Sequence, residues 1–214
     1  MQPSIRVLIA QKDYEALRNR LAADPQLANE PVPLGDDDPR SAHPLHRICD
    51  HVMSGVYSDD DAVELAKLFL EYGANVNGYE LNEKRDTPLI AAASLHAEKT
   101  GILYIERGAN IHHPGAHGGT ALHWAAWVGR DKLVKRLIEG GADIHKRCID
   151  FTSTPLFWAV HGYKNGGDVN RHQQVECVRL LLQAGADKTV PSAKGYMPIQ
   201  ILDATDKEMI ALLQ

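Results

Sequence analysis

The chain has 214 residues, of which 44% are hydrophobic, and a formal net charge of -5 at pH 7. That charge argues against a nucleic-acid partner, because such proteins neutralise phosphates with clustered lysine and arginine. No apolar run approaches the roughly 20 residues of a membrane-spanning helix, and the N-terminus lacks the pattern of a secretory signal. Three isolated cysteines suit a reducing compartment. Composition therefore favours a cytoplasmic protein with no membrane partner.

The first 29 residues predict a pair of capping helices. Apolar residues recur at helical spacing between Ile5 and Ala23, and the pattern ends at Asp24-Pro25. Prolines, a glycine and a run of aspartates then fill residues 30–41. We expect this segment to be a polar linker, because such residues favour turns over regular elements.

A short phrase recurs through the rest of the chain. Its copies are Thr87-Pro88-Leu89-Ile90-Ala91-Ala92, Thr120-Ala121-Leu122-His123-Trp124-Ala125-Ala126, Thr154-Pro155-Leu156-Phe157-Trp158-Ala159 and the degenerate His43-Pro44-Leu45-His46. Successive full copies begin 33 and 34 residues apart. A Gly-Ala pair follows each copy, at Gly73, Gly108, Gly141 and Gly185.

This period and phrase resemble the ankyrin repeat family, in which each unit is a turn followed by two helices. The resemblance covers about residues 5–214 and implies an all-α solenoid of stacked helix-turn-helix units with short turn hairpins. We expect a single domain over residues 1–214, a whole small protein and a monomer. Its predicted parts are N-terminal capping helices (5–29), a linker (30–41), repeat 1 with an insertion (42–79), repeat 2 (80–112), repeat 3 (113–145), repeat 4 with an insertion (146–188) and a C-terminal cap (189–214).

Repeat 3 is the most regular copy and repeat 2 the weakest. In repeat 3, Thr120 is placed to cap the first helix, Gly129 to end it, and a second helix is predicted over Asp131–Glu139. In repeat 2, helices are predicted near Pro88–His96 and Glu98–Glu106.

The extra residues of repeats 1 and 4 fall between the first and second helix, at Asp50–Asp59 and Gly162–Gln173. The stretch Gly162–Asp168 is rich in turn formers, which predicts a mobile loop. We expect the two insertions to form walls beside a binding surface, and deletion of the second to leave the fold intact.

The ankyrin resemblance implies a non-catalytic module, without a cofactor, that binds a protein partner through its concave face. We expect Trp127 to be exposed there and to anchor the partner, since large exposed aromatic residues are typical of binding hot spots. Trp124 and Trp158 occupy matching places in successive repeats and are expected to stack in the core. Phe151 is a second apolar candidate, on a turn tip. The other candidate contact residues are Ser94, Leu95, Lys84, Asp86, His117, Val128, Asp150 and His161.

Two other functions stay open at this point. A small-ligand or metal-binding regulatory protein would use the turn bearing His112, His113 and His117 together with the 162–173 loop, although a metal needs several converging ligands. A scaffolding subunit of a homo-oligomer is the third hypothesis. Enzyme activity is not expected, because no nucleophile elbow, phosphate-binding glycine loop or metalloprotease spacing occurs.

Two histidines have a structural interpretation. His46 and His123 hold the fourth position of the recurring phrase. The family resemblance implies that their rings bond to the neighbouring threonine and to the backbone across the repeat boundary.

Overall fold

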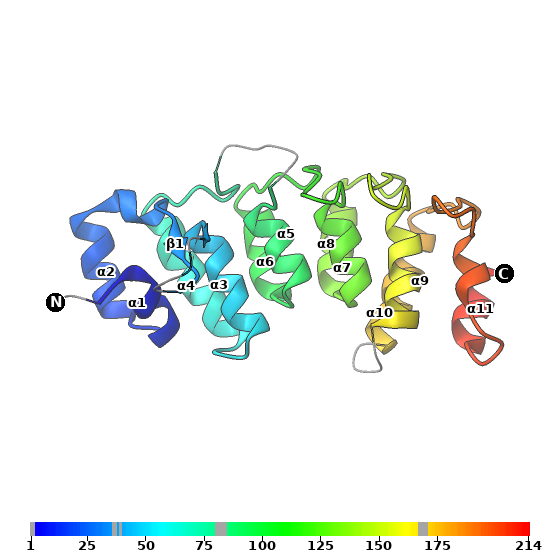
Figure 1. The fold of residues 1–214 in the computed structure, drawn as a ribbon, viewed down its shortest axis with the longest axis horizontal. Coiled ribbons are helices and arrows are strands. Elements are labelled where there is room, and N and C mark those ends of the chain that lie inside the picture. The colour runs from blue at the N-terminus through cyan, green and yellow to red at the C-terminus, as the bar shows by residue number, and fades with distance from the viewer. Residues whose placement is uncertain (1–2, 36–37, 39, 80–84, 167–170) are drawn as a thin grey trace. The chain divides into compact units, whose positions relative to one another are not determined.

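The computed structural model describes residues 3–35, 38, 40–79, 85–166 and 171–214. The chain divides into two compact units. Unit 1 comprises Met1–Leu81 and Thr87–Asn110, and unit 2 comprises Asn82–Asp86 and Ile111–Gln214. Within the described residues almost all regular structure is helical, and the helices of each unit lie side by side in pairs (Figure 1). The predicted all-α class is confirmed.

Unit 1 opens with the predicted helix pair, α1 (Ile5–Gln11) and α2 (Tyr14–Ala23). A short 3-10 helix, η1 (Pro25–Ala28), follows. The segment expected to be a linker then holds part of a small antiparallel hairpin, in which β1 (Val32–Pro33) pairs with β2 (Ser41–Ala42).

Two further helix pairs complete unit 1. They are α3 (Pro44–Met53) with α4 (Asp59–Glu71), and α5 (Pro88–Ser94) with α6 (Glu98–Glu106). Since α3 continues to Met53 and α4 begins at Asp59, half of the first insertion lengthens these helices and a short turn over residues 54–58 remains between them. The buried side chains that hold the pairs together include Leu45, Ile48, Leu65, Phe69, Leu89 and Tyr104.

The early start of α4 places Asp59 against the next helix pair. Helix α6 has no side-chain cap of its own, because its N-cap residue is Ala97. The Asp59 carboxylate instead accepts hydrogen bonds from the backbone nitrogens of Lys99 (2.6 Å) and Thr100 (3.1 Å) and from the Thr100 hydroxyl (2.7 Å). Asp59 therefore satisfies the free N–H groups at the start of α6, as an N-cap would.

We predict that Asp59→Ala lowers the free energy of unfolding by about 1–2 kcal/mol, the range of a lost helix cap. Asp60→Ala is the matched control, because Asp60 sits in the same first turn of α4 but makes only an exposed ion pair with Lys99, which is worth at most about 1 kcal/mol. Urea unfolding measures both. Equal losses in the two variants would show that Asp59 does not act as the cap of α6.

Unit 2 repeats the helix-pair pattern. The pairs are α7 (Ala121–Val128) with α8 (Asp131–Glu139), and α9 (Pro155–Asn165) with α10 (Arg171–Gln183), and they are followed by η3 (Pro198–Ile201) and α11 (Lys207–Leu213). Helix α7 ends as predicted at Gly129, whose φ of 74° is the left-handed conformation that glycine adopts freely. The bounds of α8 are those predicted.

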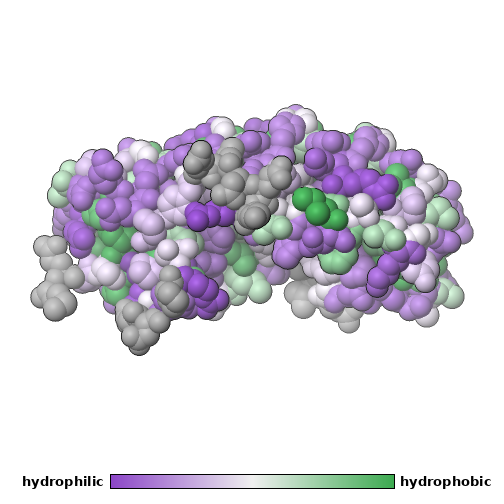
Figure 2. Space-filling model, turned by 45° about the horizontal axis from the view of Figure 1, so that its top comes forward, coloured by the Kyte–Doolittle hydropathy of each residue, from purple (hydrophilic) through white to green (hydrophobic). Residues whose placement is uncertain are grey.

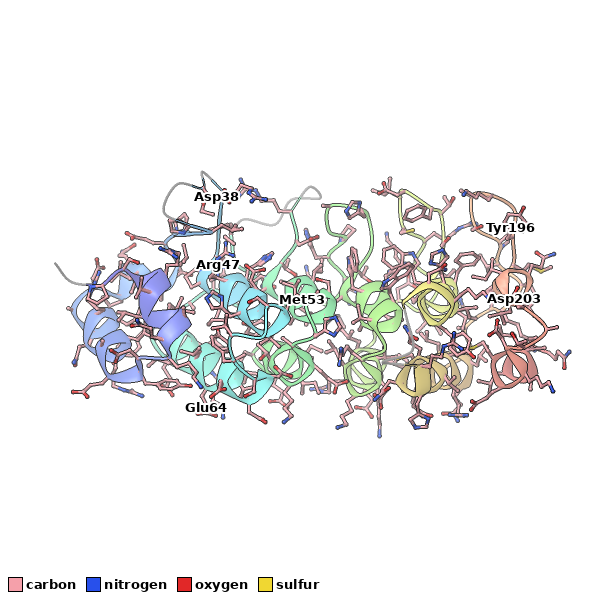
Figure 3. All side chains as sticks on the ribbon, turned by 60° about the horizontal axis from the view of Figure 1, so that its bottom comes forward. Asp38, Arg47, Met53, Glu64, Tyr196 and Asp203 are labelled. Atoms are coloured by element: carbon pink, nitrogen blue, oxygen red, sulfur yellow. The ribbon has the colours of Figure 1, made fainter. Side chains whose placement is uncertain are left out.

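The loop predicted over Gly162–Asp168 is wrong for its first part. Helix α9 runs through Gly162 to Asn165, and α10 already begins at Arg171; residues 167 and 168 lie outside the described residues. Tyr163 is buried, and Lys164 forms ion pairs with Asp206 and with Asp203, which is labelled in Figure 3. Packing overrides the turn propensity here, and because Tyr163 is buried, we now expect deletion of the insertion to remove buried contacts.

Gly162 is a point of close backbone approach between α7 and α9. A Cβ atom at this position would lie 2.1 Å from the carbonyl oxygen of Trp127, so only glycine fits. The same carbonyl accepts a hydrogen bond from the side-chain amide of Gln174 (2.9 Å). The last turn of α7 is thereby held by both helices of the following pair.

We predict that Gly162→Ala destabilises the protein by about 1–3 kcal/mol, the usual cost of overpacking, even though alanine has the higher helix propensity. Gly140→Ala is the control, because a Cβ atom there meets its neighbours at 3.4 Å or more. Thermal unfolding compares the two variants. A neutral or stabilising Gly162→Ala would mean that the helices have room to separate.

Candidate protein-binding surface

Aromatic rings gather between α7 and α9 in unit 2, around Trp158. The centroid of the Trp158 ring lies 5.1 Å from that of Trp124, 5.8 Å from Trp127 and 6.3 Å from Phe151, and all three contacts are edge-to-face. Trp124 and Trp127 stand one helical turn apart on α7, so both face the same neighbour. Such ring pairs add about 0.5–1.5 kcal/mol each beyond the area they bury.

Burial differs among the three tryptophans, and two predictions need correction. Trp158 is buried, with 6% of its surface exposed, as expected for a core residue. Trp124, expected in the core, is half-buried, and Trp127, expected to be exposed, is half-buried too. The Trp127 ring stacks on His161, with centroids 4.7 Å apart and planes at 25°. The close approach at Gly162 brings α9 over this ring, which sequence spacing does not reveal.

His161 supplies a flat, neutral surface beside Trp127. Burial lowers its pKa first, and the nearby positive charge of Lys194 lowers it further. The ring lies nearly parallel to Phe157 as well, with centroids 6.4 Å apart. At neutral pH the imidazole is therefore uncharged, and it extends the aromatic surface.

The turn that carries Phe151 is anchored on the ring cluster through Cys148. The Cys148 sulfur accepts hydrogen bonds from the indole nitrogen of Trp158 and the backbone nitrogen of Ser153, both at 3.4 Å. The next residue after Phe151, Thr152, has a φ of 46°, a strained conformation for a β-branched residue. The turn thus holds Phe151 at 56% exposure beside a buried support. Sequence reasoning missed this role of Cys148, and no local pattern signals it.

Two candidate residues on neighbouring turns contact each other, and a third bonds to the backbone. The Nδ1 atom of His117 lies 2.8 Å from a carboxylate oxygen of Asp150 on the next turn, and both side chains are exposed. Asp86 accepts a hydrogen bond from the backbone nitrogen of Ala116 (3.0 Å).

Val128, Ser94 and Leu95 are the other candidate residues that the structure describes. Val128 is half-buried at the end of α7. Ser94 and Leu95 lie at the end of α5, in unit 1, and Ser94 donates a hydrogen bond to the carbonyl of Ala91 (3.3 Å). Lys84 lies outside the described residues.

The histidine-bearing turn does not assemble a metal site from the residues that the structure describes. His113 is buried, and its Nε2 lies 3.0 Å from the carbonyl of Arg85, whereas His117 turns to Asp150. No group of three or more histidine, cysteine or carboxylate side chains that could hold a metal ion occurs among these residues.

His123 has the structural role predicted for it. Its Nδ1 accepts a hydrogen bond from the backbone nitrogen of Thr120 (3.1 Å), and its Nε2 lies 3.1 Å from the carbonyl of Lys146 and 3.2 Å from that of Ser153. The ring therefore ties α7 to the following turn. Burial lowers its pKa from 6.5 to about 4.

His46 lies 3.8 Å from a carboxylate oxygen of Asp50 on the same helix, and its bonds across the repeat boundary stay a prediction. His43 occupies the capping position of α3. Its Nδ1 accepts a hydrogen bond from the backbone nitrogen of Leu45 (3.2 Å), and its Nε2 lies 3.1 Å from the side-chain oxygen of Asn29.

The depressed pKa of His123 makes stability depend on pH. Because the folded pKa lies below the unfolded one, the contribution of His123 is complete above pH 6.5 and is lost as the pH falls through 4. We predict that the loss is on the order of 3 kcal/mol in acid and that His123→Gln flattens the pH profile of urea unfolding. The exposed His145→Gln is the control. Parallel profiles for wild type and His123→Gln would contradict the assignment.

Comparisons with known proteins identify the repeats. The family model for ankyrin repeats matches residues 52–148 and 102–192, more than half of the chain. The human protein named palmitoyltransferase ZDHHC13 is 33% identical over 144 residues, which cover 62% of this chain and 22% of that protein. The Drosophila melanogaster palmitoyltransferase Hip14 is 31% identical over 97 residues, 45% of this chain and 14% of that protein.

The chain thus spans less than a quarter of the length of these relatives. Among the residues that the structure describes, no helix is both long enough and apolar enough to cross a membrane.

Proposed function

Because the chain belongs to the ankyrin repeat family, whose repeats generally mediate protein–protein interaction, we propose that unit 2 binds a protein partner through its aromatic rings. The surface formed by Trp124, Trp127, Phe151 and His161 is called the ring surface below. The observation that carries the proposal is that Trp124, Trp127 and Phe151 pack against the buried Trp158 and that His161 stacks on Trp127. All four rings of the surface nevertheless remain partly exposed. The role is non-catalytic.

Physical chemistry favours this surface over the rest of unit 2. Aromatic side chains bury a large area on binding, and rings already fixed by their neighbours lose little further conformational entropy. Trp127 is stacked on His161 and Trp158 is held by Cys148, so the free protein already presents the rings in a defined geometry. Interface hot spots are enriched in such residues.

Polar residues around the rings complete the proposed site. His117 and Asp150 form a hydrogen-bonded pair on neighbouring turns, and Asp86 and Val128 lie on the same unit. Ser94 and Leu95 remain separate proposals for unit 1. We further propose a cytoplasmic monomer, which fits the three cysteines, since all are buried and none forms a disulfide within the part of the chain that the structure describes.

The metal-binding alternative is not proposed, because the histidines of the 112–117 turn bond to different partners. Transferase chemistry is not proposed either, because the chain matches only a minor part of the palmitoyltransferases it resembles.

Phe151→Ala is the sharpest test, because Phe151 is exposed and its truncation removes little packing, whereas Trp127→Ala would also cost stability. Met53→Ala is the matched control, since Met53 lies at the end of α3 in unit 1 and is 57% exposed (Figure 3). We predict that Phe151→Ala weakens the binding of a partner isolated from a native extract by about 2 kcal/mol, a hot-spot value. Calorimetric titration of that partner measures it. Equal affinity of wild type and Phe151→Ala would refute the ring surface.

A further inference from the structure

Three large apolar side chains project from the turns of unit 2. They are Ile149, Phe151 and Tyr196, which are 66%, 56% and 52% exposed. Figure 2, in which the edge of the turns comes forward, shows hydrophobic areas set among hydrophilic ones. Exposed apolar residues that gather in one place mark interaction surfaces.

Hydrogen bonds join the turns that carry these residues. The backbone nitrogen of Ala193 donates to the carbonyl of Phe151 (2.8 Å), and the Arg147 guanidinium donates to the carbonyls of Thr152 (2.6 Å) and Pro191 (2.7 Å). On the other side, Ile149 lies against Gly118 of the preceding turn. The turns therefore form one continuous tip surface, defined here as residues 143–153 and 187–196.

The tip surface carries more cations than anions. It holds four cations, Lys146, Arg147, Lys188 and Lys194, and three anions, Asp143, Asp150 and Asp187, a net charge of +1 within a chain of -5.

Each anion already has a local hydrogen-bond donor: the backbone of His145 for Asp143, the ring of His117 for Asp150, and Thr189 for Asp187. Among the described residues, no carboxylate pairs with Lys146, Lys188 or Lys194. Arg147 bonds only to backbone carbonyls in the same part of the chain. The side chains of Lys146, Lys188 and Lys194 are therefore available to form ion pairs with carboxylates of a partner.

We propose that the tip surface recognises an extended, acidic segment of a partner protein, whose apolar side chains contact Ile149, Phe151 and Tyr196 while its carboxylates face Lys146 and Lys194. The inference rests on the proposed function and names the partner's chemistry. Charge complementarity of this kind sets specificity and the rate of association more than raw affinity. Lys194 also lies close enough to influence His161, so this cation borders the ring surface.

A protein segment fits this surface better than an anionic membrane does. A flat bilayer would contact the projecting tips and their three aspartates together, at a repulsive cost. It would leave untouched the half-buried rings of Trp124 and Trp127, which lie beside the tips and which a peptide can reach. Anionic vesicle binding is therefore an outcome that contradicts the proposal.

The test is selection of random linear peptides, displayed on phage, on the full chain. We expect the enriched peptides to combine acidic and apolar residues. A selected peptide should bind the double variant Lys146→Glu/Lys194→Glu roughly tenfold more weakly, the effect of losing two exposed ion pairs and gaining repulsion, and added salt should weaken wild type more than the variant. The control is Lys135→Glu/Lys207→Glu, which changes the net charge equally on α8 and α11 of the same unit.

The possible negative results contradict either the acidic-segment inference or the proposed function. Peptides without acidic residues that still need Phe151 would overturn the acidic-segment inference and leave the ring surface standing. Peptides that bind Phe151→Ala as well as they bind wild type would overturn the proposed function. Co-sedimentation of the protein with phosphatidylcholine–phosphatidylserine vesicles, lost in Lys146→Glu/Lys194→Glu, would assign the cations to a membrane and overturn the inference.

Discussion

The backbone contact between α7 and α9 sets the geometry of unit 2. Where Gly162 lies against the Trp127 carbonyl, no side chain separates the two helices, and the helices approach as closely as their backbones permit. That approach decides which rings meet. Trp127 stacks on His161, and Trp124 and Trp127 both face Trp158. The side chain of Gln174 donates a hydrogen bond to the Trp127 carbonyl at the end of α7. A bulkier residue at position 162 would push the helices apart and separate the rings.

The turn beyond α8 depends on the same ring cluster. Trp158 donates a hydrogen bond to the Cys148 sulfur, and the His123 ring bonds to the carbonyls of Lys146 and Ser153. Side chains of α7 and α9 therefore fix both ends of the turn. The backbone of this turn, which includes the strained Thr152, keeps the Phe151 side chain exposed to solvent. Strain of this kind persists where the surrounding structure enforces it. The binding surface proposed here is thus a consequence of core packing and not an independent feature of a loop.

Helix positions were predictable from the sequence where the signals are local. The recurring phrase, Gly129 and the apolar spacing of Asp131–Glu139 each act within one or two helical turns, and the corresponding elements are as predicted. Predictions failed where the local structure depends on a residue far away in the sequence. Gly162 belongs to a stretch of turn formers, but it is helical because α7 packs against it. Trp127 is half-buried for the same reason, and the cap that Asp59 supplies to α6 joins residues 40 or more positions apart.

The chain has three tryptophans, of which Trp124 and Trp127 belong to the ring surface and Trp158 lies buried against them, so their indole N–H resonances are probes of that surface and of its support. The most direct measurement is a titration of the isotopically labelled protein with a bound partner or selected peptide, followed by nuclear magnetic resonance. If the ring surface is the binding site, the resonances of the half-buried Trp124 and Trp127 shift with the same saturation curve as binding, and the buried Trp158 shifts less. Saturable binding that leaves all three indole resonances in place would contradict the central claim.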